Sequence, residues 1–113
     1  MHELSIVDDM FRIILEVARQ EGMVRIDKVH FQIGRMMHIV PDQFRFAFEA
    51  ARKHTIAEQA DLEIEWLDIK MRCRQCGLEF FIKESAYKCN YCGGKDLDLL
   101  QGKELFIKSI EGA

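Results

Sequence analysis

The sequence predicts an α+β fold: a small mixed sheet of about three strands with two helices, and a small cysteine-rich module inserted near the C-terminus. Apolar residues recur at three- and four-residue spacing in two segments, as in amphipathic helices, and alternate with polar residues in strand-like segments. All four cysteines fall within residues 73–92. The length of 113 residues suits a compact domain that carries a smaller module.

The first helix is predicted over residues 5–21. Ser5 and Asp8 resemble a capping box in which Asp replaces the usual Glu or Gln, and Gly22 is a plausible stop at the C′ position. The apolar positions fall on one face because they follow the helical period, and they are Leu4, Val7, Met10, Phe11, Ile14, Leu15 and Ala18.

A strand, a helix and a second strand are expected to follow. Residues 28–33 alternate in the manner of a half-buried strand that Gly34 ends. Pro41 can open a helix at its first turn, and residues 62–66 alternate again. The stretch from 28 to 69 therefore suits a right-handed crossover. Residues 104–110 return to strand-like composition and can rejoin the same sheet.

The cysteines have the spacing of a metal site. Cys73 and Cys76 form one C-x2-C pair, and Cys89 and Cys92 form another after a twelve-residue spacer. Four thiolates at tetrahedral corners suit Zn(II), and the glycine after each pair permits a tight turn. Two disulfides, a redox-active dithiol and iron in the same four thiolates are the alternatives. Zinc is the preferred interpretation, and it completes the fold class with an inserted C-terminal zinc ribbon.

The predicted domains follow from this change of character. Residues 1–70 and 97–113 would form an α/β domain, and residues 71–96 would form the zinc-ribbon domain. Four thiolates leave no open position for water or substrate, so the zinc is expected to be structural and not catalytic. No nucleophile–base pair and no phosphate-binding glycine loop stands out in the sequence, so we do not expect an enzyme.

Composition limits the possible partners and the compartment. The net charge is −3, which gives no global basic field for nucleic acid. No apolar run approaches the roughly 18–20 residues that span a bilayer, and the first residues do not form a signal peptide. We therefore expect a cytoplasmic protein with no membrane partner. The ribbon itself has a small basic excess, so a zinc-ribbon adaptor that binds nucleic acid or a protein partner is the alternative function.

The start of the chain offers a second set of metal ligands. The Met1 amine, the His2 imidazole and the backbone nitrogens of His2 and Glu3 can reach one ion together. Nitrogen donors in a square-planar set favour Ni(II) or Cu(II). The Glu3 carboxylate could add a ligand or orient one. From spacing alone, a frayed terminus without metal is the competing interpretation.

Both features occur together in a known family. The chain resembles the hydrogenase nickel-incorporation protein family, HypA/HybF, over essentially its whole length. Arg35 and Gln59 depart from residues often found in that family, but neither lies in a metal motif. The matching segments are Met1 to Ser5, Ile33-Gly34, Pro41 to Glu49, Thr55 to Glu58, and the late C-x2-C-x12-C-x2-C motif.

The resemblance implies a metallochaperone that carries Ni(II) to the large subunit of [NiFe]-hydrogenase during maturation. It implies a GTPase accessory protein as partner and, in some organisms, urease maturation proteins as well. Met1, His2 and Glu3 match the nickel-binding segment of the family. Its zinc ligands match Cys73, Cys76, Cys89 and Cys92.

Overall fold

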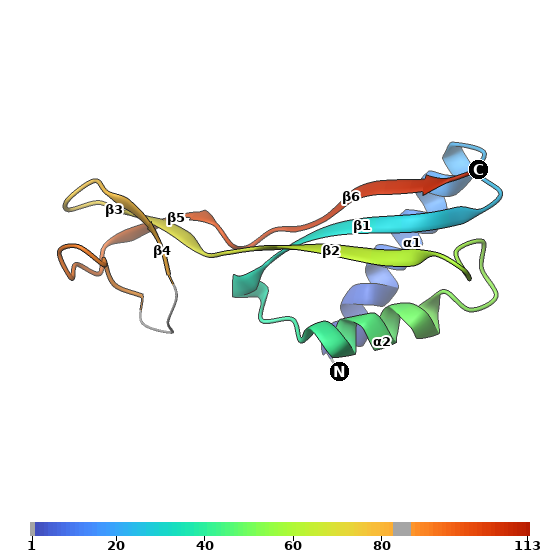
Figure 1. Ribbon diagram of the computed structural model, residues 1–113, viewed down its shortest axis with the longest axis horizontal. Helices are drawn as coiled ribbons and strands as arrows, with labels where there is room; N and C mark the ends of the chain where they lie inside the picture. The colour runs from blue at the N-terminus through green and yellow to red at the C-terminus, as the bar shows by residue number, and fades with distance from the viewer. Residues whose placement is uncertain (1, 83–86) are drawn as a thin grey trace. The chain divides into compact units, whose positions relative to one another are not determined.

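The computed structural model describes residues 2–82 and 87–113, apart from the side chain of His2. Within these residues the chain forms two α-helices and two sheets of three strands each, which are labelled in Figure 1. The predicted fold class is therefore confirmed. The elements are α1 (His2–Gln20), β1 (Ile26–Gly34), the 3-10 helix η1 (Arg35–Met37), α2 (Pro41–Ala51), β2 (Asp61–Leu67), β3 (Lys70–Cys73), β4 (Glu79–Phe81), β5 (Leu97–Gln101) and β6 (Leu105–Gly112).

The first sheet has the strand order β2-β1-β6. In Figure 1 the colours of β1 and β2 advance in the same direction, so these two strands are parallel and the sheet is mixed. The Gly34 N–H donates to the Glu104 carbonyl at 2.8 Å, and the Ala113 N–H donates to the Arg25 carbonyl at 3.0 Å. One residue number rises as the other falls, so β1 and β6 are antiparallel. In the sequence, helix α2 lies between strands β1 and β2, as the predicted crossover requires.

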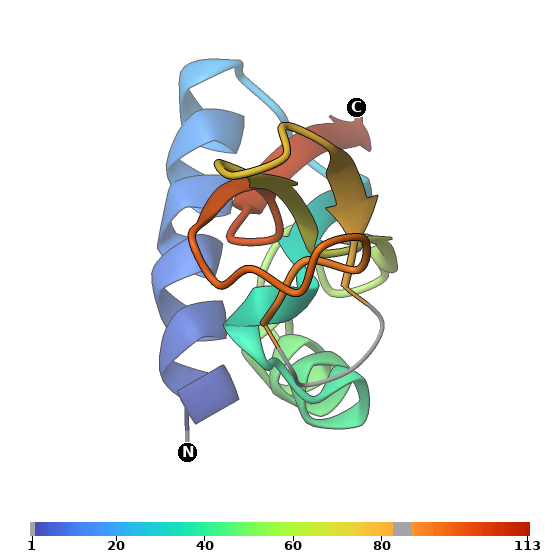
Figure 2. The same ribbon diagram turned by 90° about the vertical axis from the view of Figure 1, so that its left-hand side faces the viewer.

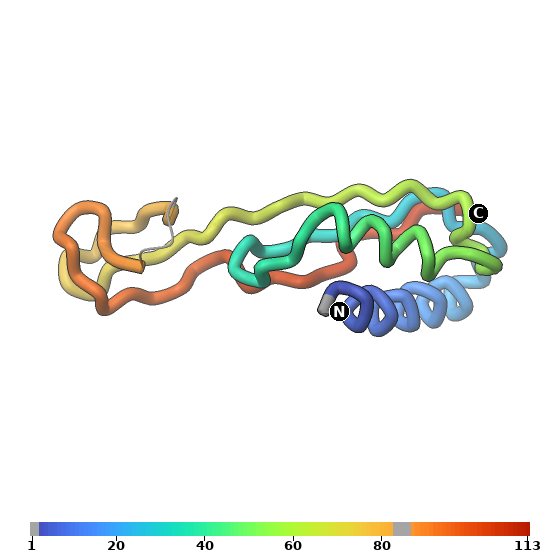
Figure 3. Tube along the Cα trace, turned by 90° about the horizontal axis from the view of Figure 1, so that it is seen from below, coloured from blue at the N-terminus to red at the C-terminus, as the bar shows by residue number. Residues whose placement is uncertain are grey.

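Phenylalanines join the two helices to the apolar face of this sheet. Phe31 of β1 meets Phe44 of α2 edge-on, with 5.3 Å between ring centroids. Phe11 of α1 meets Phe48 of α2 at 5.5 Å. Each such pair contributes about 0.5–1.5 kcal/mol beyond the burial of its area. Figure 3 shows α1 and α2 on the same side of this sheet.

Helix α1 begins earlier than the sequence pattern predicts. It starts at His2, so Ser5 lies inside the helix and the predicted Ser5–Asp8 capping box is wrong. The buried stripe also differs at its start, because Glu3 is buried whereas Leu4 is 43% exposed. An acidic residue in the first turn suits the positive end of the helix dipole. The contact that buries Glu3 comes from a distant part of the chain.

The end of α1 is as predicted. Gly22 has a φ of +69°, which lies in the left-handed region. Its N–H donates to the Arg19 carbonyl at 3.1 Å, and the Met23 N–H donates to the Ala18 carbonyl at 2.9 Å. These two bonds form a Schellman motif with Gly22 at C′.

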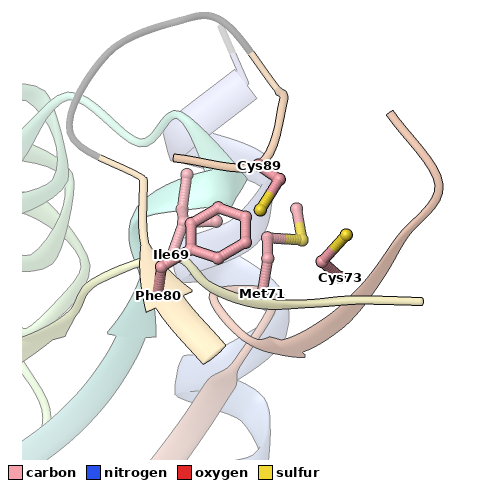
Figure 4. Close-up of a cluster of buried hydrophobic side chains, with 5 residues drawn as sticks. All are labelled: Ile69, Met71, Cys73, Phe80 and Cys89. Carbon is pink, nitrogen blue, oxygen red and sulfur yellow. The ribbon is translucent and has the colours of Figure 1, made fainter. Parts of the chain in front are cut away.

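A second, antiparallel sheet has the order β4-β3-β5 (Figure 2). Strands β3, β4 and β5 were not predicted individually from the sequence. Met71 of β3 pairs with Phe80 of β4 on one side and with Leu99 of β5 on the other. A small core forms on this sheet from Ile69, Met71, Cys73, Phe80 and Cys89 (Figure 4).

The chain divides into two compact units. The first combines Met1–Gln32, Ile39–Glu65 and Phe106–Ala113, and the second combines Ile33–His38 and Trp66–Leu105. The predicted boundaries after residue 70 and before residue 97 stay a prediction. Within the described residues, no helix is both long enough and apolar enough to cross a membrane.

The segment Ile33–His38 is built into the second unit by hydrogen bonds. The Met36 N–H donates to the Gly102 carbonyl at 2.9 Å, and the Arg35 guanidinium donates to the Asp68 carboxylate at 2.7 Å. A Cβ on Gly34 would lie 2.0 Å from the Gly102 oxygen. Glycine at position 34 is therefore required by the close approach of two backbones.

Candidate metal centre

The four cysteine sulfurs form one cluster in the second unit. All four lie within 4.8 Å of one another. The Sγ atoms of Cys73 and Cys92 are 3.6 Å apart, and those of Cys76 and Cys89 are 3.7 Å apart. Four sulfurs at tetrahedral corners about 2.3 Å from one ion would be separated by about 3.8 Å. The cluster therefore has the dimensions of a tetrahedral thiolate site.

The same distances decide against disulfides. A disulfide requires about 2.05 Å between its sulfurs, and all four cysteines are free thiols here. The donor set suits zinc or iron, since both accept four thiolates in tetrahedral geometry. With four protein ligands the site would be closed, so it offers no open position for substrate or water.

Two similar turns deliver the sulfurs. Cys73 is the last residue of β3, and the N–H of Gly77 donates to its carbonyl at 2.8 Å. The N–H of Gly93 donates to the Cys89 carbonyl at 3.0 Å in the same way. The φ angles of Gly77 and Gly93 are +78° and +75°, so both turns need the left-handed conformation that glycine adopts without strain. This confirms the turns expected after each C-x2-C pair.

Backbone donors set the electrostatics of Cys89. Its burial opposes ionisation, but the N–H groups of Cys92 and Tyr91 donate to its sulfur, both at 3.4 Å. The pKa of Cys89 is lowered from 9.0 to about 6, because these donors and the neighbouring thiols outweigh the raising effect of burial. The Cys89 thiol therefore ionises at a lower pH than an ordinary cysteine.

The pKa of Cys92 is shifted in the opposite direction. The Gly94 N–H favours its ionised form, but hydrogen bonds with Cys73 and Cys89 raise the pKa of Cys92 from 9.0 to about 11. The negative charge is therefore unevenly shared in the metal-free cluster. A bound divalent cation removes this difference, because it deprotonates its thiol ligands outright.

Two basic side chains of the second unit are paired with carboxylates. Arg74 contacts both Asp96 and Asp98, and Lys70 contacts Glu79 at 3.3 Å. The pKa of Arg74 is raised by its hydrogen bond to Asp98 and by the charges of both aspartates. At these two positions a carboxylate competes with any phosphate partner for the basic group.

The N-terminal candidates are less completely described. Met1 lies outside the described residues, and His2 is described only as the first residue of α1. The Glu3 side chain is buried, with 5% exposure, and its Oε2 accepts a hydrogen bond from the Val40 N–H at 3.2 Å. The predicted nickel ligand set therefore stays a prediction, but the position of one member is known.

The other three histidines do not join a metal cluster in the described part of the chain, where only the four cysteines form one. His30 is partly exposed in β1, and His38 and His54 are exposed with φ angles of +54° and +61°. The sequence reasoning missed Val40 as the partner of Glu3. The sequence does contain a signal for this contact. Val40 precedes Pro41 at the start of a helix and has no side-chain acceptor of its own, so the helix start needs an acceptor from elsewhere in the chain.

Comparisons with known proteins cover nearly the whole chain. Residues 1–112 match the family model for hydrogenase/urease nickel incorporation, the metallochaperone HypA. A hydrogenase maturation factor HypA from Nostoc punctiforme is 39% identical over 111 residues, which cover 98% of this chain and 95% of that protein. The factor of the same name from Rhizobium leguminosarum bv. viciae is 34% identical over 111 residues and covers 98% of each chain.

A solved structure gives the same result for the fold. The solution structure of the Ni metallochaperone HypA from Helicobacter pylori aligns with a TM-score of 0.69 and 25% sequence identity. The alignment covers 97% of this chain and 96% of the other.

Proposed function

The chain belongs to the HypA family of nickel-incorporation metallochaperones, and we propose that it binds Ni(II) at its N-terminus and delivers it to the large subunit of [NiFe]-hydrogenase. The observation that carries the proposal is the family match over residues 1–112, which includes both the Met1-His2-Glu3 start and the four cysteines. We propose no catalytic step for this chain, so any GTP hydrolysis comes from a partner.

The nickel ligands are the Met1 amine, the His2 imidazole and the backbone nitrogens of His2 and Glu3. This set is rich in nitrogen, which suits square-planar Ni(II). The helical position of His2 supports the proposal, because an α-helix does not use its first backbone N–H groups for its own hydrogen bonds. A metal that replaces the amide proton of His2 therefore costs α1 no internal hydrogen bond.

The cysteine cluster holds one Zn(II) per chain as a structural ion. The close spacing of the sulfurs and the depressed pKa of Cys89 support this assignment. We assign the zinc to a ribbon domain of residues 71–96 and the nickel to a domain of residues 1–70 and 97–113. Separate domains would allow one metal to stay bound while the other is transferred.

The partners are a hydrogenase-maturation GTPase accessory protein and the [NiFe]-hydrogenase large subunit. Urease maturation proteins are further candidates, since the family description names both hydrogenase and urease. The site of action is the cytoplasm, where thiols stay reduced and available to zinc.

A nickel titration of untagged, zinc-loaded protein tests the proposal. The wild type should bind Ni(II) in a nitrogen-rich site, and His2→Ala should lose most of that affinity. His30→Ala is the matched control, because His30 lies in β1 between the buried Val29 and Phe31 and so faces the other side of the sheet from the two helices. Equal nickel binding by wild type and His2→Ala would show that the N-terminal mechanism is wrong.

A further inference from the structure

Glu3 stands out because it is a buried carboxylate. Among the described residues it is the one polar or charged side chain in the buried class, at 5% exposure. It belongs to the core-facing stripe of α1, where Val7 and Phe11 follow it at 1% and 5% exposure. Burial of a carboxylate is unfavourable unless hydrogen bonds compensate for the lost water. The partner that it meets in this position therefore matters.

That partner is the backbone of Val40, whose N–H donates to Glu3 Oε2 at 3.2 Å across 37 residues of sequence. Val40 is the N-cap of α2 and has no side-chain cap hydrogen bond of its own. Pro41, the first residue of the helix, has no N–H to offer. The bond to Glu3 therefore satisfies a donor at the start of α2.

The arrangement has the logic of a capping box. In that motif, a carboxylate three residues into a helix reaches back to the N-cap N–H. The corresponding residue of α2 is Gln43, which is exposed. The carboxylate of Glu3 makes this contact from another helix, at the end of α2 where the helix dipole favours negative charge. It thereby ties the first turn of α1 to the first turn of α2.

We infer that Glu3 is a positioning residue of the nickel site: its carboxylate stays on the Val40 N–H and does not coordinate nickel. The bond fixes the backbone nitrogens of His2 and Glu3 relative to α2. The Met1 amine, the His2 imidazole and the backbone nitrogens of His2 and Glu3 already complete a square plane, so the carboxylate is not needed as a ligand. This inference rests on the proposed nickel site for its function, although the anchoring contact itself does not depend on nickel.

The chain on both sides of the contact is packed, while Val40 itself is 45% exposed. Ile39, next to Val40, is buried at 7% exposure, and Phe44 of α2 is fully buried. Val7, one turn after Glu3, is also buried. The first turn of α1 can therefore be positioned through α2 without a bound metal.

Amide hydrogen exchange of Val40 in metal-free protein tests the anchor alone. Glu3→Ala removes the acceptor and should speed Val40 exchange by about tenfold, the factor expected for a hydrogen bond of ordinary net strength. Glu3→Gln keeps an oxygen acceptor and should exchange much closer to the wild type. Glu16→Ala is the control, because Glu16 is exposed and pairs with Arg19. Unchanged exchange in Glu3→Ala would overturn the anchor.

Nickel spectroscopy then tests the role in the site. X-ray absorption should show the same nickel ligands in the wild type and in Glu3→Gln, with affinities within about threefold. Glu3→Ala should keep these ligands but release nickel about tenfold faster, because about tenfold is the factor expected for the net free energy of one hydrogen bond. Loss of a ligand from the nickel coordination sphere in Glu3→Ala would overturn the inference, because it would show that the carboxylate coordinates nickel.

The two proposals fail in different ways. If His2→Ala binds nickel like the wild type, the proposed N-terminal nickel site is wrong, and the positioning role is overturned with it. The Val40 exchange result would still report correctly on the anchor. If His2→Ala loses nickel but Glu3→Ala releases it at the wild-type rate, the nickel site stands and only the positioning role is wrong.

Discussion

The four-cysteine cluster and the first turn of α1 differ in how the chain positions their potential ligands. The cluster gathers sulfurs from two C-x2-C turns, and glycines with φ near +75° to +78° shape both turns. The proposed nickel ligands come from three consecutive residues, and the Glu3 carboxylate accepts a hydrogen bond from the N–H of Val40, which is 37 residues away in the sequence. The cysteine site, which is assembled from two separate turns, suits an ion that is retained. The proposed nickel site, which lies within one helical turn, suits an ion that is transferred.

The largest effect is expected from Cys89→Ser. Structural zinc contributes about 10–16 kcal/mol of apparent binding free energy in small zinc modules, and loss of one thiolate removes much of it. The second unit should lose its zinc and its ordered sheet, while the packing of α1 and α2 persists. Metal analysis and amide exchange check this result. Asn90→Ser, in the same turn, should keep about one zinc per chain.

A retained zinc and an unchanged β4-β3-β5 sheet in Cys89→Ser would contradict the structural role of the site. If both units unfolded together in Cys89→Ser, the contrast between a zinc-dependent second unit and an independent first unit would be wrong. This result would show that the first unit depends on the zinc.

A smaller effect is expected from Gly34→Ala. The new Cβ would lie 2.0 Å from the Gly102 oxygen and 2.7 Å from the Lys103 nitrogen, and backbone atoms cannot rotate away as a side chain can. We expect a loss of about 1–3 kcal/mol in the free energy of unfolding, as for other overpacked sites. Thermal or denaturant unfolding of the zinc-loaded protein measures it.

Gly77→Ala is the matched comparison for this prediction. A Cβ at Gly77 would meet nothing within 4 Å, so its cost of about 1–2 kcal/mol comes from the φ of +78° alone. Gly77→Asn should recover part of the loss, because Asn tolerates the left-handed region. If Gly34→Ala is as stable as the wild type, the segment Ile33–His38 is not tied to the second unit as described.

The smallest effect concerns the pH dependence of the metal-free cluster. The pKa of Cys89 is lowered to about 6, so its contribution to stability is present above pH 9.0 and is lost as the pH falls through about 6. The pKa of Cys92 is raised to about 11, so its contribution is present below pH 9.0 and is lost as the pH rises through about 11. In a pH titration of the metal-free protein, the thiolate absorbance should rise in a first step near pH 6.

Two variants assign that step. Cys89→Ser should remove it, and Cys92→Ser should leave a thiol that still ionises well below the ordinary pKa. A single step near pH 9 in the wild type would mean that the N–H donors of Tyr91 and Cys92 do not act on Cys89 as the geometry indicates.

The sequence predicted those features that depend on local patterns. Val7, Phe11, Ile14 and Ala18 follow the helical period and are buried in α1. The alternation around Phe31 predicted β1, and the cysteine spacing predicted the cluster. Each of these signals lies within a short stretch of chain, so no knowledge of distant contacts was needed.

Features that depend on distant contacts were missed. The early start of α1 accompanies the bond between Glu3 and Val40, and a single sequence does not show such pairs. Strands β3, β4 and β5 span only three to five residues each, too few for a clear alternation. The attachment of Ile33–His38 to the second unit rests on Gly34 and Gly102, whose backbones meet only after folding.

Metal exchange in one molecule tests the central contrast most directly. Protein loaded with one nickel and one zinc is mixed with a chelator that reports both ions separately. We predict that nickel leaves in a fast phase that is absent from His2→Ala, whereas zinc stays bound in both proteins until a denaturant opens the ribbon. Release of both metals in a single phase, or a fast nickel phase that persists in His2→Ala, would contradict the account.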